Sequence, residues 1–220
     1  MRTLVIAPHP DDEVLGVGGT IARFAREGHE IHVAIVTKGE PDLFPAYLIE
    51  QGREEAATCH ELLGVKETHF MDFPAARLDT VQHHLLNSAI ATVISKVCPQ
   101  LVFLPFGYDM HKDHRLVFES ALVALRPMAA SSVVDILCYE TLSETNWNMP
   151  SGTQSFSPNV FVDISEFLET KLRAARAYAS QMKTFPHERS IEAIACLAKL
   201  RGATIGKDAA ESFVQVRRIV

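Results

Sequence analysis

Apolar runs of strand length alternate with longer segments of helical periodicity along most of the chain. The runs rich in Val, Ile and Leu predict strands at residues 3–9, 30–39, 67–73, 101–107 and 133–140. The segments between them predict helices at residues 14–28, 47–64, 79–97 and 115–126. Continuous apolar strands that alternate with helices predict an α/β protein, whose mostly parallel sheet is covered by helices on both faces.

The pattern changes after Glu140. Residues 142–159 are rich in Ser, Thr, Asn, Gly and Pro and predict a long loop, of a length that is often functional. Beyond it we expect a strand at 161–165, helices at 166–183 and 190–200, and a last edge strand in VQVRRIV at 214–220. We therefore expect one domain over residues 1–220, with a core at 1–140 and a C-terminal extension at 141–220 that completes the site.

Composition and charge exclude several classes of protein. With 47% hydrophobic residues among 220, the chain can bury a sizeable core, so global disorder is excluded. The net charge of −6 argues against nucleic acid as a partner, and no apolar run reaches the roughly 20 residues of a membrane span. The N-terminus lacks the features of a signal peptide, so we expect a cytoplasmic protein. The four cysteines form no CxxC pair, and we expect them to be buried, reduced thiols that bind no zinc.

The first polar cluster follows the first predicted strand, in IAPHPDDEVLG at residues 6–16. In open parallel sheets, ligands bind beyond the carboxyl ends of the strands, where His9, Asp11 and Asp12 stand. His9 and Asp12 together suit zinc, while the neighbouring Asp11 is free to act as a base. Glu13 is interpreted as a first-turn acid that favours the helix.

The second cluster is GYDMHKDHRLVF at residues 107–118, which also follows a predicted strand. His111 and His114 are three residues apart, a spacing that places both on one helix face. A third protein ligand after His9 and Asp12 would leave one coordination position open for water, as in catalytic zinc sites. Asp113 is placed to orient a histidine through its second ring nitrogen.

Two other interpretations of the first cluster explain it less well. Turn residues and helix caps would account for one or two acids, but not for a preceding histidine and a matching second cluster. The GVGG at residues 16–19 could open a dinucleotide site, but Ile21 stands where the fingerprint requires Gly or Ala. We expect these glycines instead to let the helix pack closely behind the site.

With both clusters considered, the chain resembles the PIG-L/LmbE family of zinc-dependent de-N-acetylases. The specific stretches are APHPDDEVLGVGGTIA at 7–22 and HKDH at 111–114. The supporting stretches are VTKGE at 36–40, REEAATCHELLGV at 53–65, YETLSETNW at 139–147, KLRAARAYASQ at 171–181 and AAESF at 209–213. The family usually has Pro where Lys112 stands.

The resemblance implies a Rossmann-like fold and hydrolysis of the acetamido group of an N-acetylglucosamine-type sugar or glycoconjugate. By position, it implies that His9, Asp12 and His114 bind Zn²⁺ and that Asp11 is the general base. It further implies that His111, oriented by Asp113, stabilises the oxyanion in its protonated form or protonates the leaving amine. Arg53 would lie near the sugar.

Other residues are weaker candidates for substrate binding. Tyr108 and Asp109 precede His111 and are candidates to line the pocket, and His187 is a candidate to reach the substrate. Two further hypotheses stay open: the same hydrolysis on a non-sugar N-acyl substrate, and a non-catalytic carbohydrate- or metal-binding protein on this scaffold. The ligand set also suits Fe²⁺ or Co²⁺, and a homo-oligomer is compatible with the sequence.

Overall fold

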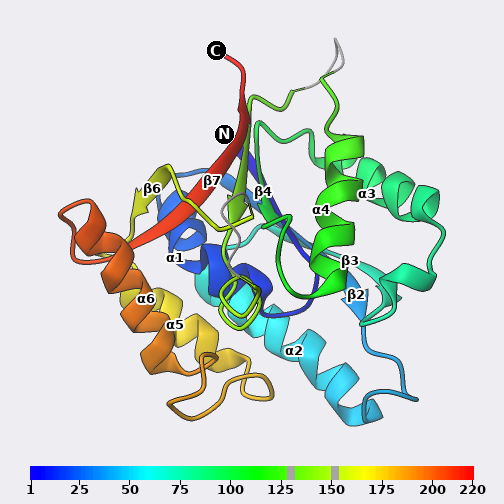
Figure 1. Ribbon diagram of the computed structural model, residues 1–220, viewed down its shortest axis with the longest axis horizontal. Coiled ribbons are helices and arrows are strands. Elements are labelled where there is room, and N and C mark those ends of the chain that lie inside the picture. Colours follow the sequence, from blue (N-terminus) through cyan, green and yellow to red (C-terminus); the bar gives the residue numbers. More distant parts are fainter. Residues whose placement is uncertain (128–131, 150–153) are drawn as a thin grey trace.

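The computed structural model describes residues 1–127, 132–149 and 154–220 and contains one seven-stranded sheet with the strand order β3-β2-β1-β4-β5-β7-β6 (Figure 1). The strands are β1 (Arg2–Ala7), β2 (Glu30–Lys38), β3 (Glu67–Pro74), β4 (Leu101–Pro105), β5 (Asp135–Tyr139), β6 (Val160–Asp163) and β7 (Ala210–Arg218). Strands β1 to β5 are parallel, and β7 runs antiparallel to β5 and β6. The predicted α/β class with a mostly parallel sheet is therefore confirmed.

Helices cover both faces of this sheet, and Figure 1 shows α3 and α4 on the side opposite to α1, α2, α5 and α6. The helices are α1 (Asp12–Arg26), α2 (Ala46–Leu63), α3 (His83–Val97), α4 (Lys112–Ala124), α5 (Leu168–Ala177) and α6 (Ile191–Thr204). Alternate strand residues divide between two cores: Val5 and Phe103 face the α1 side, whereas Leu4 and Val102 face the α3 side. Fully apolar strands are needed because both of their faces are buried.

The order of the strands places the site. The chain starts in the middle of the sheet at β1, moves outward to β3, and then returns to β4 on the other side of β1. This reversal between β1 and β4 is the point at which open α/β sheets bind their ligands, beyond the carboxyl ends of the strands. Among the described residues, none of the helices combines the length and apolar character that crossing a lipid bilayer requires.

Several boundaries differ from the sequence predictions. The helix expected at 79–97 is divided into a 3-10 turn (Leu78–Thr80) and α3. The Asp113 carboxylate accepts a hydrogen bond from the backbone N–H of Leu78 at 3.2 Å. Helix α5 ends at Ala177 rather than near residue 183, because the backbone N–H and hydroxyl of Ser180 both donate to Glu55. Residues 150–153 of the predicted loop lie outside the described residues.

The last strand starts earlier than we expected, and only its second part, from Val214, is paired on one side alone. β7 begins at Ala210, and its first four residues pair with the short strand β6, which forms the edge, whereas Phe213 to Arg218 pair with β5. The prediction of four buried thiols is correct for Cys59 and Cys138, whereas Cys98, directly after α3, and Cys196, on α6, are exposed.

A buried ion pair fastens the C-terminal part of the chain to α1. Nζ of Lys171 lies 2.6 Å from Glu211 Oε1 and donates to the carbonyl of Leu15 at 2.8 Å. The Glu211 carboxylate accepts from the backbone N–H groups of Gly19 and Thr20. Because both charges are buried and hydrogen-bonded, this pair fixes α5 and β7 against the helix that carries the first polar cluster.

The glycines of α1 allow close packing, as the sequence predicted. A Cβ atom on Gly16 would lie 2.3 Å from Cδ2 of Tyr139, and one on Gly19 would lie 2.6 Å from Cδ1 of Ile164. Tyr139 cannot move away easily, since it is fully buried and donates a hydrogen bond to the Ile6 carbonyl at 2.9 Å.

We therefore expect Gly16→Ala to lower the free energy of unfolding by about 1–3 kcal/mol, the usual cost of overpacking. Gly52→Ala is the matched control, because no atom lies within 4 Å of its added Cβ and alanine favours a helix. Urea denaturation of both variants measures the difference. Equal stabilities would contradict the packing role of Gly16.

Candidate active site

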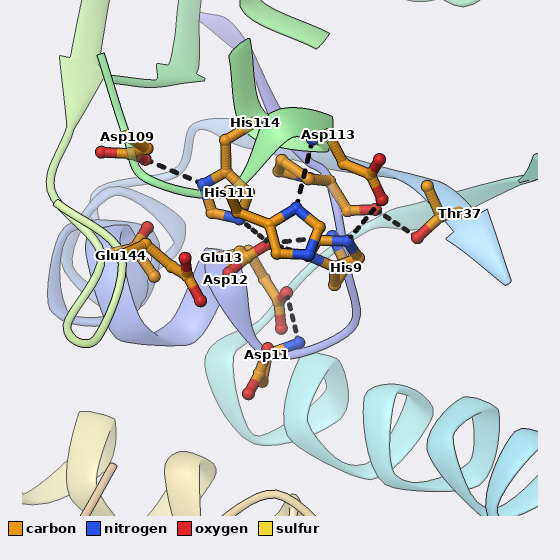
Figure 2. Close-up of polar contacts among 12 residues, drawn as sticks. His9, Asp11, Asp12, Glu13, Thr37, Asp109, His111, Asp113, His114 and Glu144 are labelled. Atoms are coloured by element: carbon orange, nitrogen blue, oxygen red, sulfur yellow. Dashed lines mark hydrogen bonds and ion pairs between the residues drawn. The ribbon is translucent and has the colours of Figure 1, made fainter. Parts of the chain in front are cut away.

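The two polar clusters meet at the carboxyl ends of β1 and β4, which are neighbours in the sheet. Figure 2 shows His9, from the turn before α1, and His114, from the start of α4, in contact with Asp12, and His111 in contact with the backbone of Asp113. The ring centroids of His9 and His111 are 4.6 Å apart, and those of His9 and His114 are 5.3 Å apart. Thr37 on β2 fastens the first turn, because its N–H and its hydroxyl both donate to the Pro8 carbonyl.

Asp12 lies between two imidazoles. Its Oδ2 atom is 3.3 Å from Nδ1 of His9 and 3.2 Å from Nε2 of His114. Asp12 and His114 are fully buried, and each of the three residues offers a ligand atom within 4.8 Å of the others. Two histidines and one carboxylate are a donor set that suits a catalytic zinc or a similar divalent ion.

Each of these two histidines is held by a second carboxylate on its other ring nitrogen. Nε2 of His9 lies 3.0 Å from Asp113 Oδ2, and Nδ1 of His114 lies 2.8 Å from Asp109 Oδ2. Such carboxylate–histidine pairs fix the orientation of metal-ligating imidazoles. They leave Nδ1 of His9 and Nε2 of His114 facing Asp12.

The buried atoms at the centre of this group fit a metal ion. Asp12 Oδ1 and His114 Nε2 are both buried without a hydrogen bond, which is costly for polar atoms unless another ligand satisfies them. Burial lowers the pKa values of His9 and His114, but the neighbouring carboxylates of Asp12, Asp113 and Asp109 outweigh it and raise them to about 9 and about 10. The site therefore attracts positive charge, as protons or as a metal cation.

Asp11 stands beside this group in an unusual backbone conformation, with φ at 107°. Its N–H donates to Glu13 Oε2 at 3.2 Å, and its Oδ2 accepts from Nη1 of Arg189 at 3.0 Å. Burial raises the pKa of Asp11 to about 8, although the positive charge of Arg189 acts to lower it. The carboxyl group can therefore give and take a proton near neutral pH.

His111 differs from its prediction in two ways. Its Nδ1 accepts from the backbone N–H of Asp113 at 3.1 Å, whereas the Asp113 carboxylate is paired with His9 and not with His111. Burial and the neighbouring positive charge of His9 lower the pKa of His111 to about 4. This direction favours a neutral imidazole, whereas the resemblance implied a protonated one. Because Nδ1 accepts, the ring proton is on Nε2.

A cavity of about 250 Å³ opens next to these groups. Its polar lining includes His9, Asp11, His111, Gln181 and Arg189. Its apolar lining comes largely from α2 and the segment before it, with Phe44, Leu48 and Ile49, and from Phe70 on β3. A small-molecule group that enters this cavity would meet Asp11 and His111 directly.

The predicted substrate-binding residues lie in different places. Arg53 lines the cavity, packs over the ring of Phe70 at 4.6 Å and pairs with Asp72. Tyr108 and His187 are exposed and are not part of this cavity lining. Asp109 was expected to line the pocket, but it is fully buried and bonded to His114 and to the Thr145 hydroxyl. It therefore orients the His114 ring and is not part of the cavity lining.

Two features of the site were missed in the sequence. Arg189, in the segment before α6, joins Asp11 to Glu144 and Ser143. Glu13, interpreted only as a first-turn acid, is fully buried, where it accepts from the Tyr178 hydroxyl at 2.6 Å and lies 3.3 Å from His60 Nε2. Neither contact has a local signal, because 178 residues separate Arg189 from Asp11 and 165 separate Tyr178 from Glu13.

Comparisons with known proteins agree with this geometry. The sequence profile of the PIG-L family, described as GlcNAc-PI de-N-acetylase, matches residues 4–125, which include both polar clusters. The chain is 29% identical over 201 residues to the diacetylchitobiose deacetylase of Thermococcus kodakarensis, covering 85% of this chain and 71% of that protein. It is 32% identical over 186 residues to the uncharacterized deacetylase YaiS of Escherichia coli, covering 80% and 90%.

A solved structure extends the similarity to almost the whole chain. The conserved protein TT1542 from Thermus thermophilus superimposes with a TM-score of 0.80 at 27% identity, covering 99% of this chain and 96% of that one. The resemblance that the sequence motifs indicated is thereby confirmed, and the chain belongs to the PIG-L family of de-N-acetylases.

Proposed function

We propose that this protein is a metal-dependent hydrolase that removes the N-acetyl group from an N-acetylglucosamine-type sugar or glycoconjugate and releases acetate. One observation carries the proposal: the two histidines that flank Asp12 are each bonded to a second carboxylate, and Asp11 lies beside them in the lining of the cavity. The family description and the diacetylchitobiose deacetylase relative support an acetamido sugar as the substrate class.

His9, Asp12 and His114 would hold the metal ion, with Asp113 and Asp109 orienting the two imidazoles. The donor set favours Zn²⁺ and also admits Fe²⁺ or Co²⁺. When bound, such an ion lowers the pKa of a water molecule and polarises a carbonyl oxygen.

Asp11 is the proposed general base. Its carboxylate lines the cavity, where it takes a proton from the attacking water and later passes it to the amine that leaves. Arg189 holds the carboxylate in place and favours its ionised form. The turn that carries Asp11 keeps it out of the metal-binding group, while Asp12, one residue later, points into that group.

His111 is the proposed oxyanion donor. Because its Nδ1 accepts from the Asp113 N–H, its Nε2–H group is free to donate to the oxygen on which negative charge develops. A neutral imidazole can perform this role without a proton transfer. Asp113 then has two tasks: its carboxylate orients His9 and its backbone orients His111.

The substrate class is tested by incubating zinc-loaded protein with N-acetylglucosamine, its simple glycosides, diacetylchitobiose and an N-acetyl amino acid. Acetate and primary amine are measured together. Equal amounts of both from the sugars, and little from the amino acid, are expected. Turnover of the amino acid alone would move the proposal to a non-sugar N-acyl substrate. No turnover of any compound by metal-loaded protein would favour the binding-protein hypothesis.

Arg189→Met is expected to move the acid limb of the kcat/KM profile to higher pH by about one unit or more. The base must be deprotonated to act, so activity rises with pH through the pKa of Asp11. Arg189 lowers that pKa, and its removal therefore raises it. Arg53→Met is the matched control, because Arg53 lines the same cavity but pairs with Asp72. We expect it to raise KM with an unchanged acid limb. If the acid limb of Arg189→Met stayed at the wild-type pH, Arg189 would not influence the pKa of the general base.

A further inference from the structure

A second group of potential ligands lies at the opposite end of the sheet from Asp12. His32 is the third residue of β2, and Glu67 and His69 are the first and third residues of β3. His32 and Glu67 are paired across the two parallel strands, as are Ala34 and His69. Because residues two apart in a strand point to the same face, all three side chains lie on one face.

The distances within this group suit ligands of one ion. Nδ1 of His32 lies 3.4 Å from Nε2 of His69 and 3.7 Å from Oε2 of Glu67. Two nitrogen atoms that bind one tetrahedral zinc at about 2.0–2.1 Å are separated by roughly 3.4 Å. Hydrogen bonds between nitrogen atoms and their acceptors are normally shorter, at about 2.7–3.2 Å. The imidazoles are thus far apart for a good hydrogen bond and well spaced for a shared cation.

The two imidazoles are in the form that binds metal. Their side chains are only 9% and 8% exposed, whereas that of Glu67 is 43% exposed. Burial lowers the pKa of both His32 and His69, so both rings are neutral at pH 7. Neutral imidazole is the ligand form, and the partly exposed carboxylate leaves a path from solvent.

The surrounding charges leave one carboxylate oxygen for an ion. Lys96, at the end of α3, pairs with Oε1 of Glu67 at 2.5 Å, while Oε2 faces His32. Lys66 is paired with Glu30 at 2.9 Å. The two lysines weaken the attraction for a cation, so this group should bind more weakly than the group around Asp12, where several buried carboxylates converge.

We propose that His32, Glu67 and His69 form a second site for a divalent transition-metal ion. Two imidazoles and one carboxylate favour Zn²⁺, Ni²⁺ or Cu²⁺ over Mg²⁺ or Ca²⁺, and three protein ligands leave a position for water. The bound ion links β2 to the edge strand β3. It therefore stabilises the edge of the sheet that carries Phe70 and Asp72, the partners of Arg53.

The test is zinc binding to untagged, chelator-stripped protein, measured by calorimetry and by elemental analysis after dialysis. Wild-type protein is expected to bind two ions per chain, the second more weakly, and Asp12→Asn to bind one. In the Asp12→Asn protein, Glu67→Gln and His69→Gln should each weaken the remaining ion at least tenfold. Zinc should also raise the Tm of the Asp12→Asn protein, and Glu67→Gln should abolish that rise.

The matched control is His84→Gln, because His84 is an exposed histidine on α3 outside the group. It should retain two ions. A single zinc ion on the wild type would overturn the proposal, as would wild-type affinity of both ions in Glu67→Gln. The Glu67 side chain is partly exposed, so that variant remains informative if His69→Gln does not fold. Neither readout depends on deacetylase activity.

Discussion

Asp12→Asn is expected to lower the affinity of the active-site group for zinc by more than about 100-fold, since loss of an outer partner alone costs about 10–100-fold. Asp12 supplies the negative charge between Nδ1 of His9 and Nε2 of His114. An amide retains the shape of the side chain and can still accept a hydrogen bond from the backbone N–H of His9, but it carries no charge. Amine release at low zinc concentration should fall with the affinity.

Competition with a chromophoric chelator measures the affinity, and amine release measures the activity. Asp79→Asn is the matched control, because Asp79 is a surface acid that pairs with Lys112 near the start of α4. It should keep wild-type affinity and rate. If Asp12→Asn bound zinc at the active-site group as tightly as the wild type, Asp12 would not be a ligand.

Asp11→Asn is expected to lower kcat by about 10²–10⁴, the usual contribution of a general base, while zinc content stays unchanged. Asparagine is preferable to alanine here, because the backbone φ of 107° is strained for most residues and tolerated best by Gly, Asn and Asp. The amide oxygen can still accept from Arg189. The variant therefore removes the base and leaves the turn intact.

Thermal unfolding and bound zinc are measured on the same Asp11→Asn sample. Unchanged Tm and zinc content together with the loss of kcat would place the defect in catalysis. Turnover near the wild-type rate, with zinc bound, would mean that another group accepts the proton.

The sheet and the centre of the site could both be predicted from the sequence, because both depend on the central strands β1 and β4. Strands β1 and β4 are buried on both faces, so each reads as a continuous apolar run, and the polar residues after such a run fall at a known place in the fold. The position of His9 next to His114 then follows from the pairing of two central strands.

The remaining parts depend on contacts that no local pattern contains. Arg189 reaches Asp11 from a segment without periodicity, and Lys171 and Glu211 form a buried pair although each alone reads as a surface charge. The prediction of β7 was incomplete: Val214 to Arg218 extend past β6 and pair only with β5, as an edge strand does, whereas the part that pairs with β6 was missed. The lowered pKa of His111 follows from its burial and from the charge of His9, which only the folded arrangement provides.

Metal dependence is tested most directly by amine release from an N-acetylglucosamine glycoside, measured on one protein sample in three states. The sample is assayed with zinc bound, after removal of the metal by a chelator, and after zinc is added back. We expect activity to be lost with the metal and restored with it, and we expect no restoration in Asp12→Asn at the same zinc concentration. Full activity in protein verified to contain no metal would contradict a metal-dependent deacetylase.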